Sequence, residues 1–165
     1  MAITIPDNLK PSDGRFGAGP SKIRGEAISN LAGSGSSLLG TSHRQKPVKN
    51  LVGQVRSGLK EFFNLPSDYE VVLGNGGSTA FWDIATFGLI ENRSQHISFG
   101  EFSSKFATAA EAAPFLQSPS IIKAEPGTRK SAVGESGIDV YALTHNETST
   151  GVAMDIERPN GADKD

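Results

Sequence analysis

The sequence predicts an α/β fold in which a mainly parallel sheet is flanked by helices. Short apolar segments with β-branched residues alternate with longer segments whose apolar residues recur every three or four positions. Glycine or polar residues follow the short segments, which is typical of strands that end at the ligand-binding edge of a doubly wound sheet. With 165 residues, the chain is long enough to bury a sizeable core.

Three segments have the apolar spacing of helices. Ser21 is expected to cap a short helix over residues 21–31, which the glycine- and serine-rich residues 33–37 should end. A clear amphipathic helix is expected over residues 48–62. Residues 79–90 are apolar nearly all round, and a helix of that kind is normally buried.

Four short segments are expected to be strands. Residues 71–73 are apolar and β-branched, which predicts a buried strand. Residues 96–99 form a weaker candidate, followed by Gly100 and an alanine-rich helix. Residues 121–122 and 140–143 are the other two candidates. In a parallel sheet the carboxyl ends of strands meet at one edge, so residues 74–79, 100–102 and 145–148 are expected to converge there.

The glycine-rich segment Gly74-Asn75-Gly76-Gly77-Ser78-Thr79 leads from an expected strand into an expected helix. Glycines that let the backbone approach an anion, with Ser78 and Thr79 at a helix N-terminus, predict a phosphate site. The same residues also fit an ordinary strand-to-helix turn capped by Ser78. The segment lacks the lysine of a P-loop and the third glycine of a dinucleotide fingerprint, so both interpretations remain open.

Three further features have two interpretations each. Arg44, with His43 beside it, could bind a carboxylate or phosphate, or could be a solvated residue of a surface loop. Phe102 could stack on a planar ring or belong to the core. The polar residues 145–148 could be functional or form a turn stabilised by Asn146. Trp82, on the apolar helix, is interpreted as a core residue.

Composition excludes several classes of function. A net charge of −2, from 16 basic and 18 acidic residues, provides no field that attracts nucleic acid or an anionic membrane. The chain has no cysteine, and its three histidines have no close spacing, so no metal site is expected. No signal peptide or membrane-spanning segment is recognisable, and a cytoplasmic protein is expected.

Five motifs together resemble one family. They occur in the order and at about the spacing of phosphoserine aminotransferases, most closely the actinobacterial branch, and they cover essentially the whole chain. The motifs are Phe16-Gly17-Ala18-Gly19-Pro20-Ser21, Gly40-Thr41-Ser42-His43-Arg44, Gly74-Asn75-Gly76-Gly77-Ser78-Thr79-Ala80-Phe81-Trp82, Gly100-Glu101-Phe102 and His145-Asn146-Glu147-Thr148-Ser149-Thr150-Gly151.

The resemblance implies the large domain of a pyridoxal-phosphate (PLP) enzyme of fold type I, like that of aspartate aminotransferase. It implies transfer of an amino group between glutamate and 3-phosphohydroxypyruvate, which gives O-phosphoserine in serine biosynthesis. Some family members also use a phosphorylated hydroxythreonine from pyridoxine biosynthesis. The family forms homodimers with sites at the interface. A different class V aminotransferase, of the alanine–glyoxylate type, and a non-catalytic phosphate-binding module remain as alternatives.

The resemblance also assigns residues. Ser78 and Thr79 match the pair that binds the PLP phosphate, and Phe102 matches the aromatic residue that stacks on the pyridine ring. Thr148 matches a threonine that contacts the cofactor at its phenolic oxygen. Arg44, with His43 beside it, matches the arginine that binds the distal anion of the substrate.

One departure from the family is large. The lysine that forms the Schiff base with PLP, and the aspartate that pairs with the pyridinium nitrogen, follow the Asn-Glu-Thr motif in this family. No lysine of this chain stands in that context, so no catalytic residue is assigned and the 165 residues alone are expected to be inactive. We expect residues 1–45 to form an N-terminal arm, a short helix and a substrate loop. Residues 46–165 are expected to be the first part of a large domain that is incomplete at its C-terminus.

Overall fold

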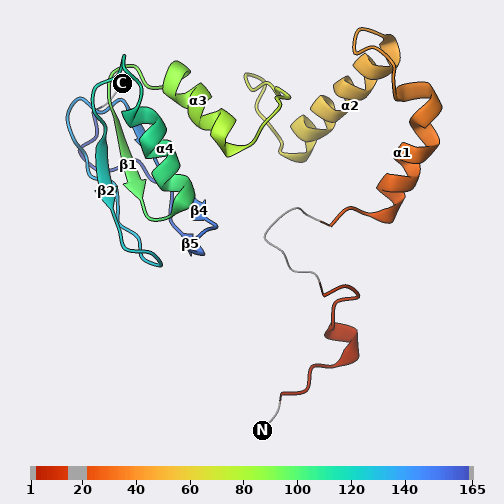
Figure 1. Cartoon of the computed structure of the whole chain (residues 1–165), viewed down its shortest axis with the longest axis horizontal. Coiled ribbons are helices and arrows are strands. Elements are labelled where there is room, and N and C mark those ends of the chain that lie inside the picture. The colour runs from red at the N-terminus through yellow and green to blue at the C-terminus, as the bar shows by residue number, and fades with distance from the viewer. Residues whose placement is uncertain (1–2, 15–21, 164–165) are drawn as a thin grey trace. The chain divides into compact units, whose positions relative to one another are not determined.

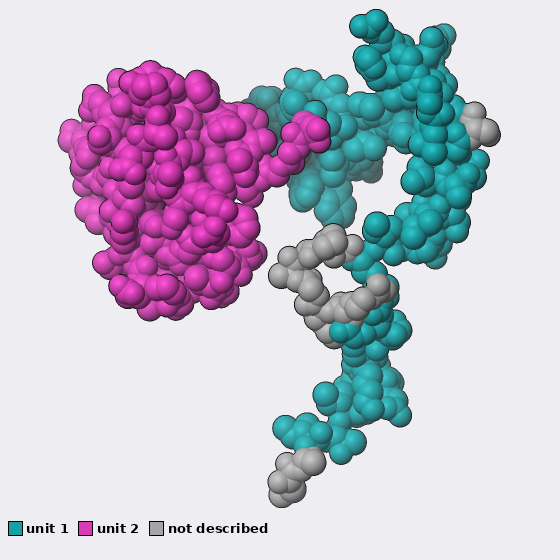
Figure 2. Space-filling model, viewed as in Figure 1, with its two compact units in different colours: residues 1–73 teal, residues 74–165 magenta. Residues whose placement is uncertain are grey.

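The computed structural model describes residues 3–14 and 22–163, and the chain divides into two compact units, residues 1–73 and 74–165 (Figure 2). The two units are the parts of the chain whose residues contact mainly one another. The expected boundary at residue 45 is a different one, between an N-terminal arm and a large domain, and it stays a prediction. Among the described helices, none is both long enough and apolar enough to cross a membrane. The glycine-rich motif at residues 16–21 lies outside the described residues.

The first unit contains the 3-10 helix η1 (Asp7–Leu9) and the helices α1 (Gly25–Leu38) and α2 (Lys46–Phe62) (Figure 1). Helix α1 begins after Arg24, and Ser21, the expected cap, lies outside the described residues. The expected break at residues 33–37 is wrong, because α1 continues to Leu38.

Serine side chains are accommodated within α1 as it passes through a glycine-rich segment. Their hydroxyl groups donate hydrogen bonds to carbonyl oxygens three or four residues earlier, so they are satisfied without ending the helix. These bonds are Ser29 to Gly25 (3.1 Å), Ser34 to Leu31 (2.9 Å) and Ser37 to Ser34 (3.0 Å).

Helix α2 confirms the expected amphipathic helix. Proline is accepted in its first turn because the N–H groups there have no partner within the helix. The helix ends just before Asn64, whose φ of +47° is the left-handed conformation typical of a helix C-terminus. Its apolar residues remain partly exposed, with Leu51 at 42% and Val55 at 42%.

The buried strand expected at residues 71–73 is wrong. This segment forms no strand and pairs with no other strand, and Val72 is 80% exposed. The physical reason is that a strand requires a neighbouring backbone, whereas this segment is held by a side chain. Arg56 donates a 2.8 Å hydrogen bond from Nε to the Val71 carbonyl oxygen and pairs with the carboxylate of Glu70.

The second unit contains a three-stranded sheet in the order β2-β1-β3. Its strands are β1 (Ser94–Ser98), β2 (Ser120–Lys123) and β3 (Val140–Ala142), and both outer strands run parallel to β1. All five residues of β1 are buried, as expected for the centre of a parallel sheet. The expected α/β fold with a parallel sheet and the last three expected strands are confirmed.

One face of this sheet is covered by a helix that carries a second helix on its outer side. Helix α4 (Glu101–Glu111) lies along β1, and α3 (Ser78–Gly88) packs against α4 (Figure 1). The rings of His96 and Phe106 lie edge to face with their centroids 4.9 Å apart. The rings of Trp82 and Phe106 are stacked, with centroids 6.5 Å apart. Trp82 is 8% exposed, so its interpretation as a core residue is confirmed.

The opposite face of the sheet carries a small apolar core. Ile97 and Phe99 pack there with Met154, which follows the hairpin of β4 (Asn146–Glu147) and β5 (Val152–Ala153). The side-chain amide of Gln95 exchanges two 2.9 Å hydrogen bonds with the backbone of Val133. These bonds fasten the connection between β2 and β3 across this face.

The expectation that the apolar helix is buried on all sides is wrong for α3. Trp82, Ala85 and Thr86 are buried, whereas Ile84 is 64% exposed and Phe87 is 74% exposed. The physical reason is that α3 has its main packing contact on one side, with α4. The outer side of α3 therefore remains apolar and exposed.

The start of α3 also differs from the expectation that Ser78 caps it. Gly77 is the residue before the helix, Ser78 is its first residue, and no side chain in the described structure caps this end. Gly76 has a φ of +139°, and a Cβ atom there would lie 2.8 Å from the Cβ of Ala80. Only glycine fits that position without displacing the helix.

Replacing Gly76 with alanine is expected to destabilise the second unit by about 1–3 kcal/mol, because alanine is both strained and crowded there. Gly77→Ala is the matched control. Its φ is −127°, and nothing lies within 4 Å of an added Cβ atom. Urea unfolding followed by the fluorescence of Trp82, the single tryptophan, measures both variants. Equal stability of the two variants would contradict this account of the turn.

The stability of the second unit is expected to fall as the pH is lowered from 6.5 to about 4. His96 is 1% exposed, its Nε2 lies 2.9 Å from Ser94 Oγ, and burial lowers its pKa to about 4. The unfolded chain therefore binds a proton at a higher pH than the folded chain, and the loss reaches about 3 kcal/mol once both states are protonated. Urea unfolding between pH 7.5 and 4, followed by Trp82 fluorescence, measures it.

His96→Gln is the control for that pH dependence, because glutamine does not titrate. The slope of unfolding free energy against pH between 4 and 6.5 should flatten in this variant. His43 and His145 are exposed and remain in both proteins. An unchanged slope in His96→Gln would show that another group causes the pH dependence.

Candidate functional site

The carboxyl ends of β1 and β3 lie next to each other, because the two strands are parallel neighbours. The chain leaves β1 into α4 on one face of the sheet and leaves β3 into the β4–β5 hairpin, whose continuation packs on the other face. Such a divergence opens a crevice at the edge of a parallel sheet. The expected convergence of residues 100–102 and 145–148 is confirmed by a 3.4 Å hydrogen bond from Phe102 N to the Glu147 carboxylate. Residues 74–79 follow no strand, so their expected place at this edge stays a prediction.

Glu147 connects these two segments, and sequence reasoning did not single it out. Its side chain is fully buried. One carboxylate oxygen accepts hydrogen bonds from Ser103 N and Ser103 Oγ, both at 2.8 Å. The other accepts from Ser149 Oγ at 2.7 Å and from Phe102 N at 3.4 Å. The carboxylate therefore occupies the N-terminus of α4, where a negative charge is favoured.

The ionised form of Glu147 is favoured inside the protein. Burial, the largest single influence, raises the pKa of this carboxyl, but the hydrogen bonds from Ser103, Ser149 and Phe102 together outweigh it and leave the pKa below its usual value. A signal existed in the sequence: a glycine directly before an expected helix offers no side-chain acceptor for the first N–H groups of that helix. The sequence did not reveal that the acceptor lies 44 residues further on.

Phe102 lies in the first turn of α4 and is 40% exposed. Its ring lies 6.4 Å from that of Trp82, tilted by 57°. Trp82 stands one helical turn after Ser78 on α3. The Trp82–Phe102 contact therefore brings the N-terminal halves of α3 and α4 together, with an uncapped helix end on one and a partly exposed aromatic ring on the other.

Ser78, Thr79 and Thr148 are exposed. Thr148 lies in the turn between β4 and β5, directly after the buried Glu147. This turn is closed by a 2.9 Å hydrogen bond from Gly151 N to the Glu147 carbonyl oxygen, and Gly151 has a φ of +70°. The polar run at residues 145–148 is thus the start of a short hairpin rather than an isolated turn.

His43 and Arg44 belong to the first unit. Both are exposed and lie in the turn before α2, where Arg44 N donates a 3.3 Å hydrogen bond to Ser42 Oγ and Gln45 N donates a 2.9 Å bond to the Ser42 carbonyl oxygen. The turn holds the backbone of these residues and leaves both side chains at the surface. Their role in binding a substrate anion stays a prediction.

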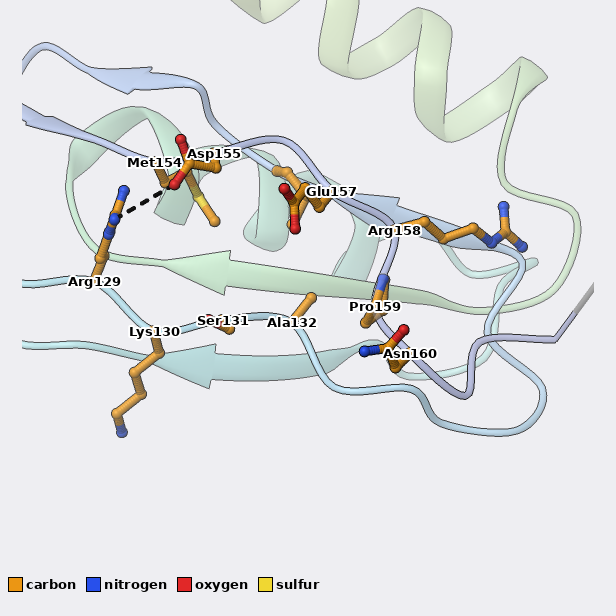
Figure 3. Close-up of a pocket in the computed structure, with 11 residues that line it drawn as sticks. Arg129, Lys130, Ser131, Ala132, Met154, Asp155, Glu157, Arg158, Pro159 and Asn160 are labelled. Atoms are coloured by element: carbon orange, nitrogen blue, oxygen red, sulfur yellow. Dashed lines mark ion pairs between the residues drawn. The ribbon is translucent and has the colours of Figure 1, made fainter.

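Of two pockets in the second unit, one lies beside the segments that contain Phe102 and Thr148, and the other lies away from them. One, of about 370 Å³, lies at the carboxyl ends of β1 and β2 and is bordered by Gly100 and Ser149, which are near Phe102 and Thr148 in sequence. The other, of about 310 Å³, lies between residues 129–132 and 154–160 (Figure 3) and contains none of the expected site residues. Its Arg129 is already bonded to the Ala153 carbonyl oxygen at 2.8 Å and paired with Asp155 at 3.6 Å.

The described residues support neither a catalytic role for Lys105 nor a metal site. Lys105, in the helix after Phe102, pairs at the surface with Glu101 at 2.8 Å. Within residues 3–14 and 22–163, no three His, Asp or Glu side chains gather in a way that could hold a metal ion.

No protein-family model matches the chain, but sequence relatives do. The chain is 63% identical over 164 residues to a phosphoserine aminotransferase of Nocardioides sp., which covers 99% of this chain and 44% of that protein. It is 56% identical over 161 residues to a putative phosphoserine aminotransferase of Mycobacterium leprae, which covers 98% of this chain and 43% of that protein. The chain thus spans less than half the length of the curated relatives it matches.

Solved structures agree with the sequence relatives. A phosphoserine aminotransferase from Cytophaga hutchinsonii matches with a TM-score of 0.72 and 28% identity, over 82% of this chain and 38% of that one. A PLP-bound phosphoserine aminotransferase from Trichomonas vaginalis matches with a TM-score of 0.65 and 18% identity, over 87% and 48% of the two chains, and at that identity it supports the fold alone. Over nearly its whole length, therefore, the chain is similar to a stretch of phosphoserine aminotransferases that makes up 43–44% of those proteins.

Proposed function

We propose that this chain forms the N-terminal part of a PLP-dependent phosphoserine aminotransferase. The full-length enzyme transfers an amino group between glutamate and 3-phosphohydroxypyruvate and gives O-phosphoserine. The observation that carries this proposal is the 63% identity to the Nocardioides protein over 99% of the chain. The site geometry of the second unit adds physical support for the cofactor.

The N-terminus of α3 is suited to hold the cofactor phosphate. The N-terminus of α4 is already filled by the carboxylate of Glu147. Helix α3 begins at Ser78 without a side-chain cap, so its first N–H groups and the hydroxyls of Ser78 and Thr79 can donate to an anion. Gly76 permits the turn into this helix, since a Cβ there would collide with Ala80.

Phe102 and Thr148 are suited to hold the ring of the cofactor. Phe102 is fixed on one side by Trp82 and is still 40% exposed, so part of its ring is accessible to a planar group. The exposed hydroxyl of Thr148 can donate a hydrogen bond to the phenolic oxygen of PLP. When bound, PLP supplies an electron sink that allows an amino group to be exchanged.

Arg44, assisted by His43, is proposed to bind the distal anion of each substrate. The guanidinium group presents paired N–H donors that fit a phosphate or a carboxylate, and both substrates carry such a group. The family's lysine and aspartate that act on the cofactor are assigned to the portion of the protein beyond this chain. We also propose a cytoplasmic homodimer in which residues 1–45 form the arm and substrate loop, and residues 46–165 form the first part of the PLP-binding domain.

Ser78→Ala combined with Thr79→Ala in the full-length enzyme is expected to weaken PLP binding by about 10- to 100-fold, because two hydrogen bonds to a charged phosphate are lost. Titrating the apoenzyme with PLP and following its visible absorbance measures the affinity. Thr108→Ala, an exposed threonine on α4, is the control and should bind PLP like the wild type. Undiminished affinity in the double variant would remove the phosphate from the α3 N-terminus.

Arg44→Ala in the full-length enzyme is expected to raise KM for both substrates by about 10- to 100-fold while PLP stays bound, since one charged hydrogen-bonding partner of each substrate is lost. Arg44→Lys should recover part of the loss, because it keeps the charge without the planar fork. Steady-state kinetics with glutamate, 3-phosphohydroxypyruvate and glyoxylate measure this, with the exposed Lys49→Ala as control. Wild-type KM values in Arg44→Ala, or a preference for glyoxylate in the wild type, would contradict the assignment.

A further inference from the structure

We propose that Glu147 is a positioning residue: its buried carboxylate holds Phe102 and Thr148 at a fixed separation, so that both can contact one cofactor. The inference rests on the proposed function, because it takes Phe102 and Thr148 as cofactor-binding residues. It goes beyond that function by assigning a role to a side chain that touches neither cofactor nor substrate.

The contacts of Glu147 join the two segments at Phe102 itself and at the residue directly before Thr148. Its carboxylate accepts the backbone N–H of Phe102 itself at 3.4 Å and that of the next residue, Ser103, at 2.8 Å. Thr148 is the next residue along the chain from Glu147. The two residues proposed to contact PLP are thus connected through one side chain, although 46 positions separate them in the sequence.

Ser149 adds a second connection beside the first. Its hydroxyl donates to the Glu147 carboxylate at 2.7 Å and accepts from Glu101 N at 2.9 Å. The residues on both sides of Thr148 therefore bind the first turn of α4. A rotation of the hairpin relative to the helix would break both connections at once.

The chemistry of the site requires a carboxylate. All the groups that face the two oxygens are donors: the N–H groups of Phe102, Ser103 and Ser149 and the hydroxyls of Ser103 and Ser149. An ionised carboxylate is acceptor-only, whereas a glutamine would turn its NH₂ group toward at least one of these donors. Because Glu147 is 0% exposed, water cannot replace a lost partner, and the mismatch is costly.

The neighbouring backbone is shaped to admit this side chain. A Cβ atom on Gly100 would overlap the Cγ and Cδ atoms of Glu147 and Ser149 Oγ. The φ of Gly100 is 179°, an extended conformation open to any residue, so the reason for glycine here is space. Gly100, Glu147 and Ser103 therefore pack together as one cluster. Within it, Ser103 Oγ also accepts a hydrogen bond from Phe99 N at 3.0 Å.

The test uses the full-length enzyme with Glu147→Gln, Glu147→Asp and the control Glu111→Gln. Glu111 is exposed at the opposite end of the same helix, so the control makes the same chemical change away from the carboxylate's partners. Each apoenzyme is titrated with PLP, and visible circular dichroism is recorded at saturation, because it reports the orientation of the bound cofactor. Thermal unfolding of each apoenzyme is measured separately.

Glu147→Gln is expected to raise the PLP dissociation constant about 10-fold, comparable to the loss when a partner that orients a metal ligand is removed. The visible circular dichroism per bound PLP should fall, and Glu147→Asp should recover part of both losses. Glu111→Gln should match the wild type. A lower melting temperature with unchanged affinity and unchanged dichroism at saturation would reduce Glu147 to a stabilising residue and overturn the inference.

Two results separate this inference from the proposed function. If the wild-type enzyme binds no PLP, both are overturned. If the wild type binds PLP and Glu147→Gln binds it identically, only the positioning role is overturned. Should Glu147→Gln fail to fold, Ser149→Ala replaces it, because that variant keeps the carboxylate and removes the second connection. It should lower the dichroism in the same direction by a smaller amount, and wild-type dichroism there would contradict the proposal.

Discussion

The burial of strand β1 is the constraint on which the second unit depends. All five of its residues are buried, so each side chain must find its packing or hydrogen-bond partners on the face of the sheet to which it points. His96 and Ser98 point to the helices, where they meet Phe106 and Ser104, and Ile97 points to the apolar core on the other side. Because both faces of β1 are covered, functional groups can reach the surface only from the segment that follows its carboxyl end.

The N-termini of α3 and α4 differ in one respect. Helix α4 has its free N–H groups filled by Glu147, an anion supplied by the chain. Helix α3 begins at Ser78, after Gly77, and lacks a cap among the described side chains. An uncapped N-terminus is costly unless water or a ligand accepts from it. The occupied terminus fixes α4 to the β4–β5 hairpin, whereas the N–H groups at the start of α3 have no side-chain acceptor among the described residues.

Sequence patterns predicted the elements whose stability is local or whose partners lie within this chain. Helix α2 and the three paired strands agree with their apolar spacing, and Trp82 is in the core as expected. Errors arose where side chains bond to the backbone. Serine hydroxyls are satisfied within α1 as it passes through Gly33 and Gly35, and Arg56 holds a segment that no strand pairs with. The parts of the site were recognisable as motifs, whereas the contacts that join them depend on residues far apart in sequence.

Exposed apolar residues lie on the outer side of α3 and in the unpaired segment at residues 71–73. Ile84 and Phe87 on α3 are 64% and 74% exposed, and Val72 is 80% exposed. Apolar surface of this extent is typical of surfaces that pack against further polypeptide. The relatives are more than twice as long as the stretch that this chain matches. Helix periodicity and β-branching thus identify apolar faces, whereas the burial of a face depends on what packs against it, which neither pattern reveals.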